Sequence, residues 1–241
     1  KTTYSGSNPS EAFVNTMYMK YNNLGQVVTK SLVQSNGDTV YTYIHYPNEF
    51  RSNSGYKNYA DDMFDNGFRN SPLRVSTQIS SKGFIKATKN EYDKLTLAND
   101  KEIYRLARVY NMKPHKVMLG SEVSDYLQLD TIYKYNEVGN MCEKVDTHGL
   151  TETYLWSYKN LYPVVSIVGA SYSQVKSALI QNVLDKNIIT FLGHSENPAL
   201  SGLNNIRTSL VSSLPNVQVN TYTYKPLVGI TSQTDTRGVT T

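Results

Sequence analysis

The chain has 241 residues, enough for one sizeable hydrophobic core or two small ones. Hydrophobic residues make up 39% and charged residues 18%, and the net charge of +4 is spread without a long basic run, which argues against a nucleic-acid partner. No apolar stretch is long enough to predict a membrane span. Twenty tyrosines against one tryptophan favour β-sheet, because a tyrosine ring packs on a half-buried sheet surface while its hydroxyl reaches water.

The first predicted elements form a meander that begins at Met19. A strand ending at Tyr21 leads into a turn that contains Asn22 and Gly25, and Gly37 marks a second turn. Asn makes local hydrogen bonds in turns and Gly adopts positive φ, so both reversals have suitable residues. Alternating side chains after Gly37 predict a third strand.

A helix is predicted next, over residues 56–68. Tyr59, Met63 and Phe64 are spaced as on one helical face, and Asn66-Gly67 is a suitable helix end. The acidic residues 61, 62 and 65 lack the ligand pattern of a calcium loop, and we interpret them as residues that begin a helix.

Strands are predicted over most of residues 73–123. Residues 73–92 suggest two strands with a turn at 81–83, and a further strand is predicted at 117–123. Residues 103–110 fit a helix or a strand, and we predict a strand because the neighbouring elements are strands.

The meander pattern recurs from Tyr133. Tyr133 and Tyr135 are predicted to place two rings on one face of a strand. Asn136 and Gly139 supply the turn, Gly149 marks the second reversal, and residues 151–156 alternate again. One such motif would be weak evidence, but the recurrence predicts a repeated strand–turn–strand unit.

Two helices are predicted to interrupt the sheet at about 171–213. Apolar residues with helical spacing follow Ser171 and Ser173, either of which is a suitable N-cap, and a second apolar stripe runs from Leu200 to Val211 before Pro215. A polar loop, residues 193–202, is expected between them. The simplest role for both helices is to cover one face of the sheet.

A third copy of the pattern begins at Tyr222. Tyr224 is followed by Gly229 with one extra residue, and then by Gly238. The same number of residues separates Tyr135 from Gly149 and Tyr224 from Gly238. We therefore predict a mainly β fold, α+β overall: an antiparallel meander of similar hairpins with a two-helix insertion, forming a single β-rich domain over residues 1–241.

The pattern Tyr-x-Tyr-(Asp/Asn)-x-x-Gly, followed by a polar and an aliphatic residue, resembles the YD repeat of Rhs-type bacterial proteins. Most of residues 15–241 also resemble the segment just upstream of the YD-repeat array in secreted or surface proteins of Gram-negative bacteria. The stretches that carry this wider resemblance are residues 43–50, 154–167, 214–235 and 237–241. The resemblance implies an extracellular or outer-membrane surface location, and strands that join a large sheet, which in toxin complexes of the family encloses a cargo.

Two departures limit the resemblance. The copies are few and far apart, and Thr236 occupies a position where the group commonly has Pro. The self-cleaving core of Rhs proteins has no visible counterpart, so that activity is not carried over. The chain is expected to continue beyond Thr241, with downstream YD repeats of its own polypeptide as the main partner.

The sequence predicts no catalytic, cofactor or metal site. The only cysteine, Cys142, cannot form a disulfide within the chain or a thiolate zinc site, and we interpret it as a small buried side chain. The histidines at 45, 115, 148 and 194 have no metal-ligand spacing, and no phosphate-binding glycine loop is present. His194-Ser195-Glu196 has triad residue types, but adjacent side chains cannot form a triad.

Tyr154, Trp156 and Tyr158 are the best candidate ligand aromatics, since they would share one face of an ideal strand. Packing beneath the helices is the alternative. Three functions follow: a non-enzymatic structural module of an exported YD-repeat protein, which we prefer; a surface module that binds glycan or another ligand through exposed rings; and, last, a hydrolase with an unrecognised site.

Overall fold

The computed structural model describes residues 2–4, 13–51, 57–113, 127–181 and 188–241. They form two compact units: residues 1–93 with 106–130 (unit 1), and residues 94–105 with 131–241 (unit 2). In each unit the strands are neighbours in chain order, as hairpin connections produce. The predicted fold class, a mainly β antiparallel meander with helices, is confirmed. The single domain stays a prediction, because compact units need not fold independently.

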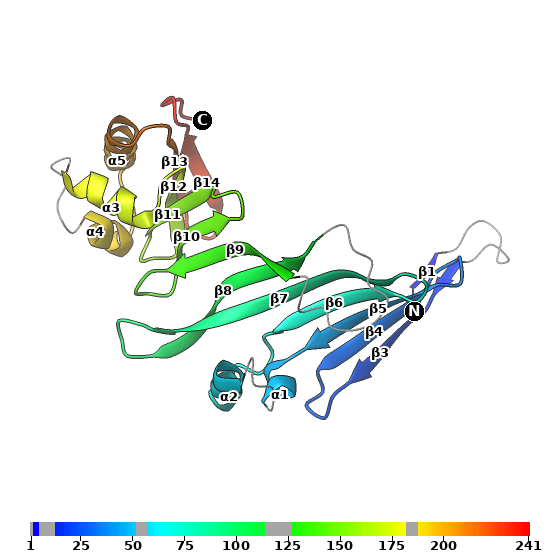
Figure 1. Cartoon of the computed structure of the whole chain (residues 1–241). Coiled ribbons are helices and arrows are strands. Elements are labelled where there is room, and N and C mark those ends of the chain that lie inside the picture. The colour runs from blue at the N-terminus through cyan, green and yellow to red at the C-terminus, as the bar shows by residue number, and fades with distance from the viewer. Residues whose placement is uncertain (1, 5–12, 52–56, 114–126, 182–187) are drawn as a thin grey trace. The chain divides into compact units, whose positions relative to one another are not determined.

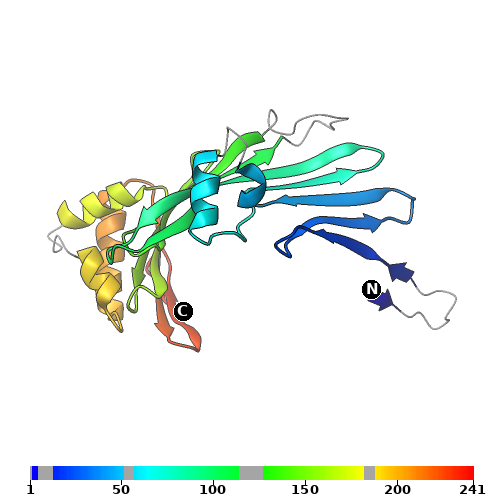
Figure 2. The same ribbon diagram turned by 90° about the horizontal axis from the view of Figure 1, so that it is seen from below.

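Unit 1 begins with a small two-stranded sheet and continues into a meander (Figures 1 and 2). The small sheet pairs β1 (Thr2–Tyr4) with β2 (Phe13–Asn15). The strands of the meander are β3 (Met17–Tyr21), β4 (Val27–Val33), β5 (Thr39–His45), β6 (Arg74–Ile79), β7 (Gly83–Thr96) and β8 (Glu102–Met112). The end of β7 and the start of β8 belong to unit 2. The predicted strand at 103–110 is therefore confirmed, and the one at 117–123 lies outside the described residues.

Two short helices connect β5 to β6. They are α1 (Pro47–Phe50) and α2 (Lys57–Asp65), and Gly67 follows α2 with a φ of 84°, so the predicted helix and its end are confirmed. The acidic residues do not begin α2. Asp61 and Asp65 lie in its second half, where Arg51 pairs with both at 3.1 and 3.3 Å. The prediction failed because α2 begins at Lys57, so Asp61 is already its fifth residue and follows the first turn.

Among the described residues, unit 2 is built mainly from the strands β9 to β14 and the helices α3 to α5 (Figure 1). The strands are β9 (Leu127–Tyr135), β10 (Met141–Asp146), β11 (Thr151–Ser157), β12 (Tyr162–Val168), β13 (Gln218–Lys225) and β14 (Gly229–Thr234), with the start of β9 in unit 1. The helices are α3 (Tyr172–Gln181), α4 (Ile188–His194) and α5 (Leu200–Ser213). The helix α4 was not predicted, because seven apolar-rich residues beside a polar loop show too little periodicity.

The core of unit 2 lies between the sheet and the three helices. Leu155, Val165, Ile167 and Val219 point from the strands toward apolar residues of the helices, and each is at most 1% exposed. The helix residues are Val175, Leu179, Leu192, Leu203, Ile206 and Leu210. The predicted role of the helical insertion, covering one face of the sheet, is confirmed.

Candidate functional site

The first two copies of the repeat fold into the same hairpin turn. In the second copy the Asn136 N–H donates to the Asn140 carbonyl at 2.9 Å, and the Gly139 N–H donates to the Asn136 carbonyl at 2.9 Å. The Asn136 Oδ1 also accepts from the N–H groups of Val138 and Asn140. This is a three-residue loop that ends in a left-handed residue, a standard way to close a hairpin.

The first copy makes the same four bonds at matching positions. Asn22 pairs with Gln26 and Gly25 through the main chain, and its Oδ1 accepts from Leu24 and Gln26 at 3.0 Å. The third copy departs from them, since Lys225 stands in place of the Asn and Leu227 adopts a φ of 66°. The predicted extra residue therefore changes the turn.

The second reversals of copies two and three use an aspartate in the same way. Asp146 accepts through Oδ1 from the N–H groups of His148 and Leu150, and Gly149 donates to the Asp146 carbonyl. Asp235 repeats this with Val239 and Gly238. The N–H donors hold the pKa of both carboxyl groups below its usual range. The shared Asp-Thr-x-Gly stretch was a signal that the sequence reasoning missed.

Gly139 has a second constraint besides its φ of 85°. A Cβ there would lie 2.9 Å from Cδ1 of Ile103 and 3.2 Å from Cδ2 of Leu97. At Gly25, Gly37 and Gly149, nothing would lie within 4 Å of an added Cβ. In the second copy the repeat glycine therefore also allows two hairpins of unit 2 to pack closely.

The repeat tyrosines have different surroundings. Tyr21 is 59% exposed, whereas Tyr133, Tyr135 and Tyr222 are half-buried. Tyr224 packs in the core, where its ring stacks on Tyr162 with centroids 4.8 Å apart and its hydroxyl donates to the Pro163 carbonyl at 2.8 Å. The repeat motif thus fixes the turn more closely than the role of the rings.

Tyr158 does not share a face with Tyr154 and Trp156. β11 ends at Ser157, and Tyr158 adopts a φ of 53°, followed by two more left-handed residues, Lys159 and Asn160. Its ring is 3% exposed, and its hydroxyl accepts from the Tyr224 N–H at 2.8 Å. Tyr158 is therefore a core residue, because the chain turns sharply where an ideal strand was assumed.

Tyr154 and Trp156 lie on the face of the sheet opposite the helices. Their neighbours Thr153, Leu155 and Ser157 are buried on the helix side, and side chains alternate along a strand. The helices therefore do not cover these two rings, contrary to the packing alternative. Trp156 donates through Nε1 to the Met141 carbonyl at 2.8 Å, and the Tyr154 hydroxyl donates to Glu152 at 2.6 Å.

A buried carboxylate links the sheet to the first helix of the insertion. Glu143 is 3% exposed, and its Oε1 lies 2.6 Å from the Lys134 Nζ while its Oε2 accepts from the Tyr172 N–H at 2.7 Å. Beside it, burial and then the charge of Glu143 raise the pKa of the Cys142 thiol to about 11. The predicted burial of Cys142 is confirmed.

The histidines that the structure describes are not gathered together. His45 lies 2.9 Å from Glu49 and 3.4 Å from Arg74, and His148 lies near Asp146. His194 ends α4, and His115 lies outside the described residues. Within those residues no three His, Cys, Asp or Glu side chains are grouped to hold a metal ion. No helix of the described ranges is long and apolar enough to cross a membrane.

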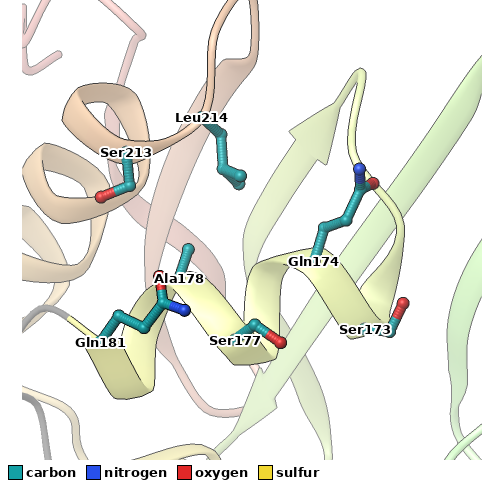
Figure 3. A pocket seen from close by; sticks show the side chains of 7 residues that line it. All are labelled: Ser173, Gln174, Ser177, Ala178, Gln181, Ser213 and Leu214. Carbon is teal, nitrogen blue, oxygen red and sulfur yellow. The ribbon is translucent and has the colours of Figure 1, made fainter.

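A shallow pocket of about 270 Å³ lies between α3 and the end of α5 (Figure 3). Its lining consists of Ser173, Gln174, Ser177, Ala178, Gln181, Ser213 and Leu214. These hydroxyl and amide groups have no neighbouring base within the lining to activate a serine. The described lining residues offer hydrogen bonds to a neutral ligand, and none of them forms an acid–base pair for catalysis.

Comparisons with known proteins do not assign the chain to a family. No protein-family model matches the chain, and no curated protein matches it. Among solved structures it is similar to the crystal structure of TcdB2-TccC3, with a TM-score of 0.32 at 11% identity over 91% of this chain and 11% of that one. A Photorhabdus luminescens Tc holotoxin pore gives 0.32 at 12% identity, over 91% and 10%.

The form of TcdB2-TccC3 without its hypervariable C-terminal region gives a TM-score of 0.33 at 12% identity, over 91% and 11%. The chain therefore spans about a tenth of the length of the structures it matches. These scores assign neither a fold nor an activity to this chain.

Proposed function

We propose that the chain is a non-enzymatic structural module of an exported YD/Rhs-repeat protein, in which it contributes strands to a β-sheet shell or surface scaffold. The observation that carries the proposal is the shared turn geometry. Four turns, at residues 22–26, 136–140, 146–150 and 235–239, use an Asn or Asp side chain to hold the same main-chain loop. Such uniformity is expected of a repeated sheet-building unit.

The edges of the sheets agree with this role. The Asn22 N–H donates to the carbonyl of Gln26, the residue just before β4. Because N–H directions alternate along a strand, the N–H groups of Met17, Met19 and Tyr21 point away from β4. All five residues of β3 are exposed. A free apolar edge invites pairing with another strand, which is what a module within a longer sheet requires.

The last residues of the sequence pair with β14. Asp235 and Gly238 close a turn, after which Thr240 bridges to Thr234 and Thr241 exchanges two main-chain bonds with Gln233 at 2.9 Å. The turn therefore sets the antiparallel register in which residues 240 and 241 lie beside β14.

Hydrogen exchange tests the proposal. The 241-residue chain is compared with the longer exported protein, and the amides of Met17, Met19 and Tyr21 are followed. We expect protection of these edge amides to rise strongly in the longer protein, while β11 amides change little. Equal exchange in both would contradict a role within a continuous sheet, and a hydrolytic activity would contradict the non-enzymatic part.

A further inference from the structure

The outer face of the unit 2 sheet, opposite α3, α4 and α5, carries aromatic rings and hydrogen-bonding groups. Tyr133, Lys144 and Glu152 are direct cross-strand neighbours, so their side chains share one face. Tyr154 and Trp156 share it with Glu152 by alternation along β11. Tyr222 approaches Tyr154 closely enough to raise the pKa of its hydroxyl, after burial and Glu152.

The two rings of β11 are held along the sheet. The Trp156 Nε1 is tied to the main chain of β10, and the Tyr154 hydroxyl is tied to Glu152 two residues back on the same strand. The Trp156 ring therefore reaches the neighbouring strand β10, the Tyr154 hydroxyl stays over its own strand β11, and both residues are half-buried. One flat side of each ring can then face outward, as stacking requires.

The charged groups of this face are one ion pair and one further carboxylate, Asp146, which shares the face with Lys144 by alternation along β10. The Lys144 Nζ lies 3.3 Å from Glu152 Oε1, so the two charges are paired. Ser166 and Asn220 continue the row from Tyr154 across β12 and β13. Flat rings beside hydroxyl, amide and paired charged groups suit a ligand with apolar C–H faces and many neutral hydroxyls, and poorly suit a polyanion.

The two faces of the same strands also differ in composition. The helix-covered face presents Val165, Ile167 and Val219, which are the branched aliphatic residues of protein packing. At adjacent positions the outer face presents Ser166 and Asn220. If the outer face packed against another sheet, we would expect it to present branched aliphatic residues, as the helix-covered face does.

We propose that this outer face binds a neutral saccharide chain, which stacks on Trp156 and Tyr154 and hydrogen-bonds to Glu152 and Lys144. The inference does not depend on the architectural role proposed above, because either can hold without the other.

Trp156 is the only tryptophan of the chain, so its fluorescence reports on this face alone. The 241-residue chain is titrated with cellohexaose, chitohexaose and maltohexaose up to about 10 mM, the range of weak binding. We expect at least one hexasaccharide to cause a saturable change in emission, and calorimetry on the same ligand to give the same Kd. Tyr154→Ala is expected to weaken binding by about tenfold, and Tyr154→Phe by much less.

The control is Tyr18→Ala, which removes a solvent-exposed tyrosine of unit 1 and is expected to leave the affinity unchanged. Circular dichroism checks that each variant is folded. Trp156→Phe is a second variant that keeps a ring at this position, and its binding is measured by calorimetry. No saturable binding of any hexasaccharide overturns the proposal. So does an affinity that is equal in the wild type and a folded Tyr154→Ala, or binding confined to a sulfated polysaccharide.

Discussion

Alanine at Gly139 is expected to destabilise unit 2 more than alanine at Gly149. Both glycines end the same kind of turn, with φ of 85° and 79°. They differ in their surroundings, since a Cβ at position 139 would meet Ile103 and Leu97 and a Cβ at position 149 would meet nothing within 4 Å. The pair therefore separates backbone strain from close packing.

The magnitude follows from these two terms. A non-glycine residue held at positive φ costs about 1–2 kcal/mol, and this cost applies to both variants. At position 139 the ends of Ile103 and Leu97 must also move, and Ile103 is 8% exposed, which adds about 1–2 kcal/mol of overpacking. We expect a loss of about 2–4 kcal/mol for Gly139→Ala and about 1–2 kcal/mol for Gly149→Ala.

Urea unfolding followed by Trp156 fluorescence measures both variants, because this tryptophan lies in the same unit. Gly139→Asn is a third variant, since Asn tolerates left-handed backbone better than Ala. Gly139→Asn should therefore regain the part of the stability that Gly139→Ala loses through backbone strain, but not the part lost through the close contact with Ile103 and Leu97. Equal losses for Gly139→Ala and Gly149→Ala would refute the argument that the repeat glycine in the second copy is also a packing residue.

Three further predictions concern titratable and buried groups of unit 2. Main-chain N–H donors lower the pKa of Asp146, so the charged carboxylate stabilises its turn at pH values above the usual carboxyl pKa, and this stabilisation is lost as the pH falls through the lowered pKa. Hydrogen exchange of the Leu150 amide should therefore become faster over that pH range. In Asp146→Asn this pH dependence should be absent. Glu143→Ala should cost about 2–3 kcal/mol, because the Tyr172 N–H loses its acceptor, and Glu143→Gln less, as measured by urea unfolding. Folding raises the pKa of the Cys142 thiol from 9.0 to about 11, so between these pH values the unfolded chain loses the thiol proton while the folded chain keeps it. The free energy of unfolding should therefore fall between about pH 9 and about pH 11. The fall should be smaller in Cys142→Ala. A pH dependence identical in Cys142→Ala and wild type would show that this thiol does not contribute.

The turns could be predicted from the sequence because their chemistry is local. Asn22 and Asn136 bond to main-chain groups within four residues, so residue type and spacing contain the needed information. The Asp-Thr-x-Gly turns at 146 and 235 hold the same information, although only their glycines were recognised. The strand periodicity likewise identified the meanders, and the apolar stripes of the helices indicated that the insertion covers one face of the sheet without showing which face.

Features that depend on distant residues could not be predicted. The position of Tyr158 depends on a run of three left-handed residues, whose main chain bonds to α4: the Lys159 N–H donates to Ser195 and the Asn160 N–H to Gly193, both at 2.9 Å. Nothing in a tyrosine-rich strand indicates where it will bend into the core. The burial of Glu143 is similar, since its partners come from β9 and from the start of α3.

The two units bury their sheets to different extents, and this bears on the architectural proposal. In unit 2 the helices bury alternate residues of β11, whereas β4 and β5 of unit 1 contain no fully buried residue. Those two strands rely on main-chain pairing and on cross-strand side-chain contacts, such as the tilted Tyr43–Phe84 pair at 6.2 Å. Because a sheet with two half-exposed faces has little hydrophobic burial, each added strand contributes a larger share of its stability. A sheet built in this way is suited to stabilisation by neighbouring strands at its exposed edge, β3, more than to an isolated existence.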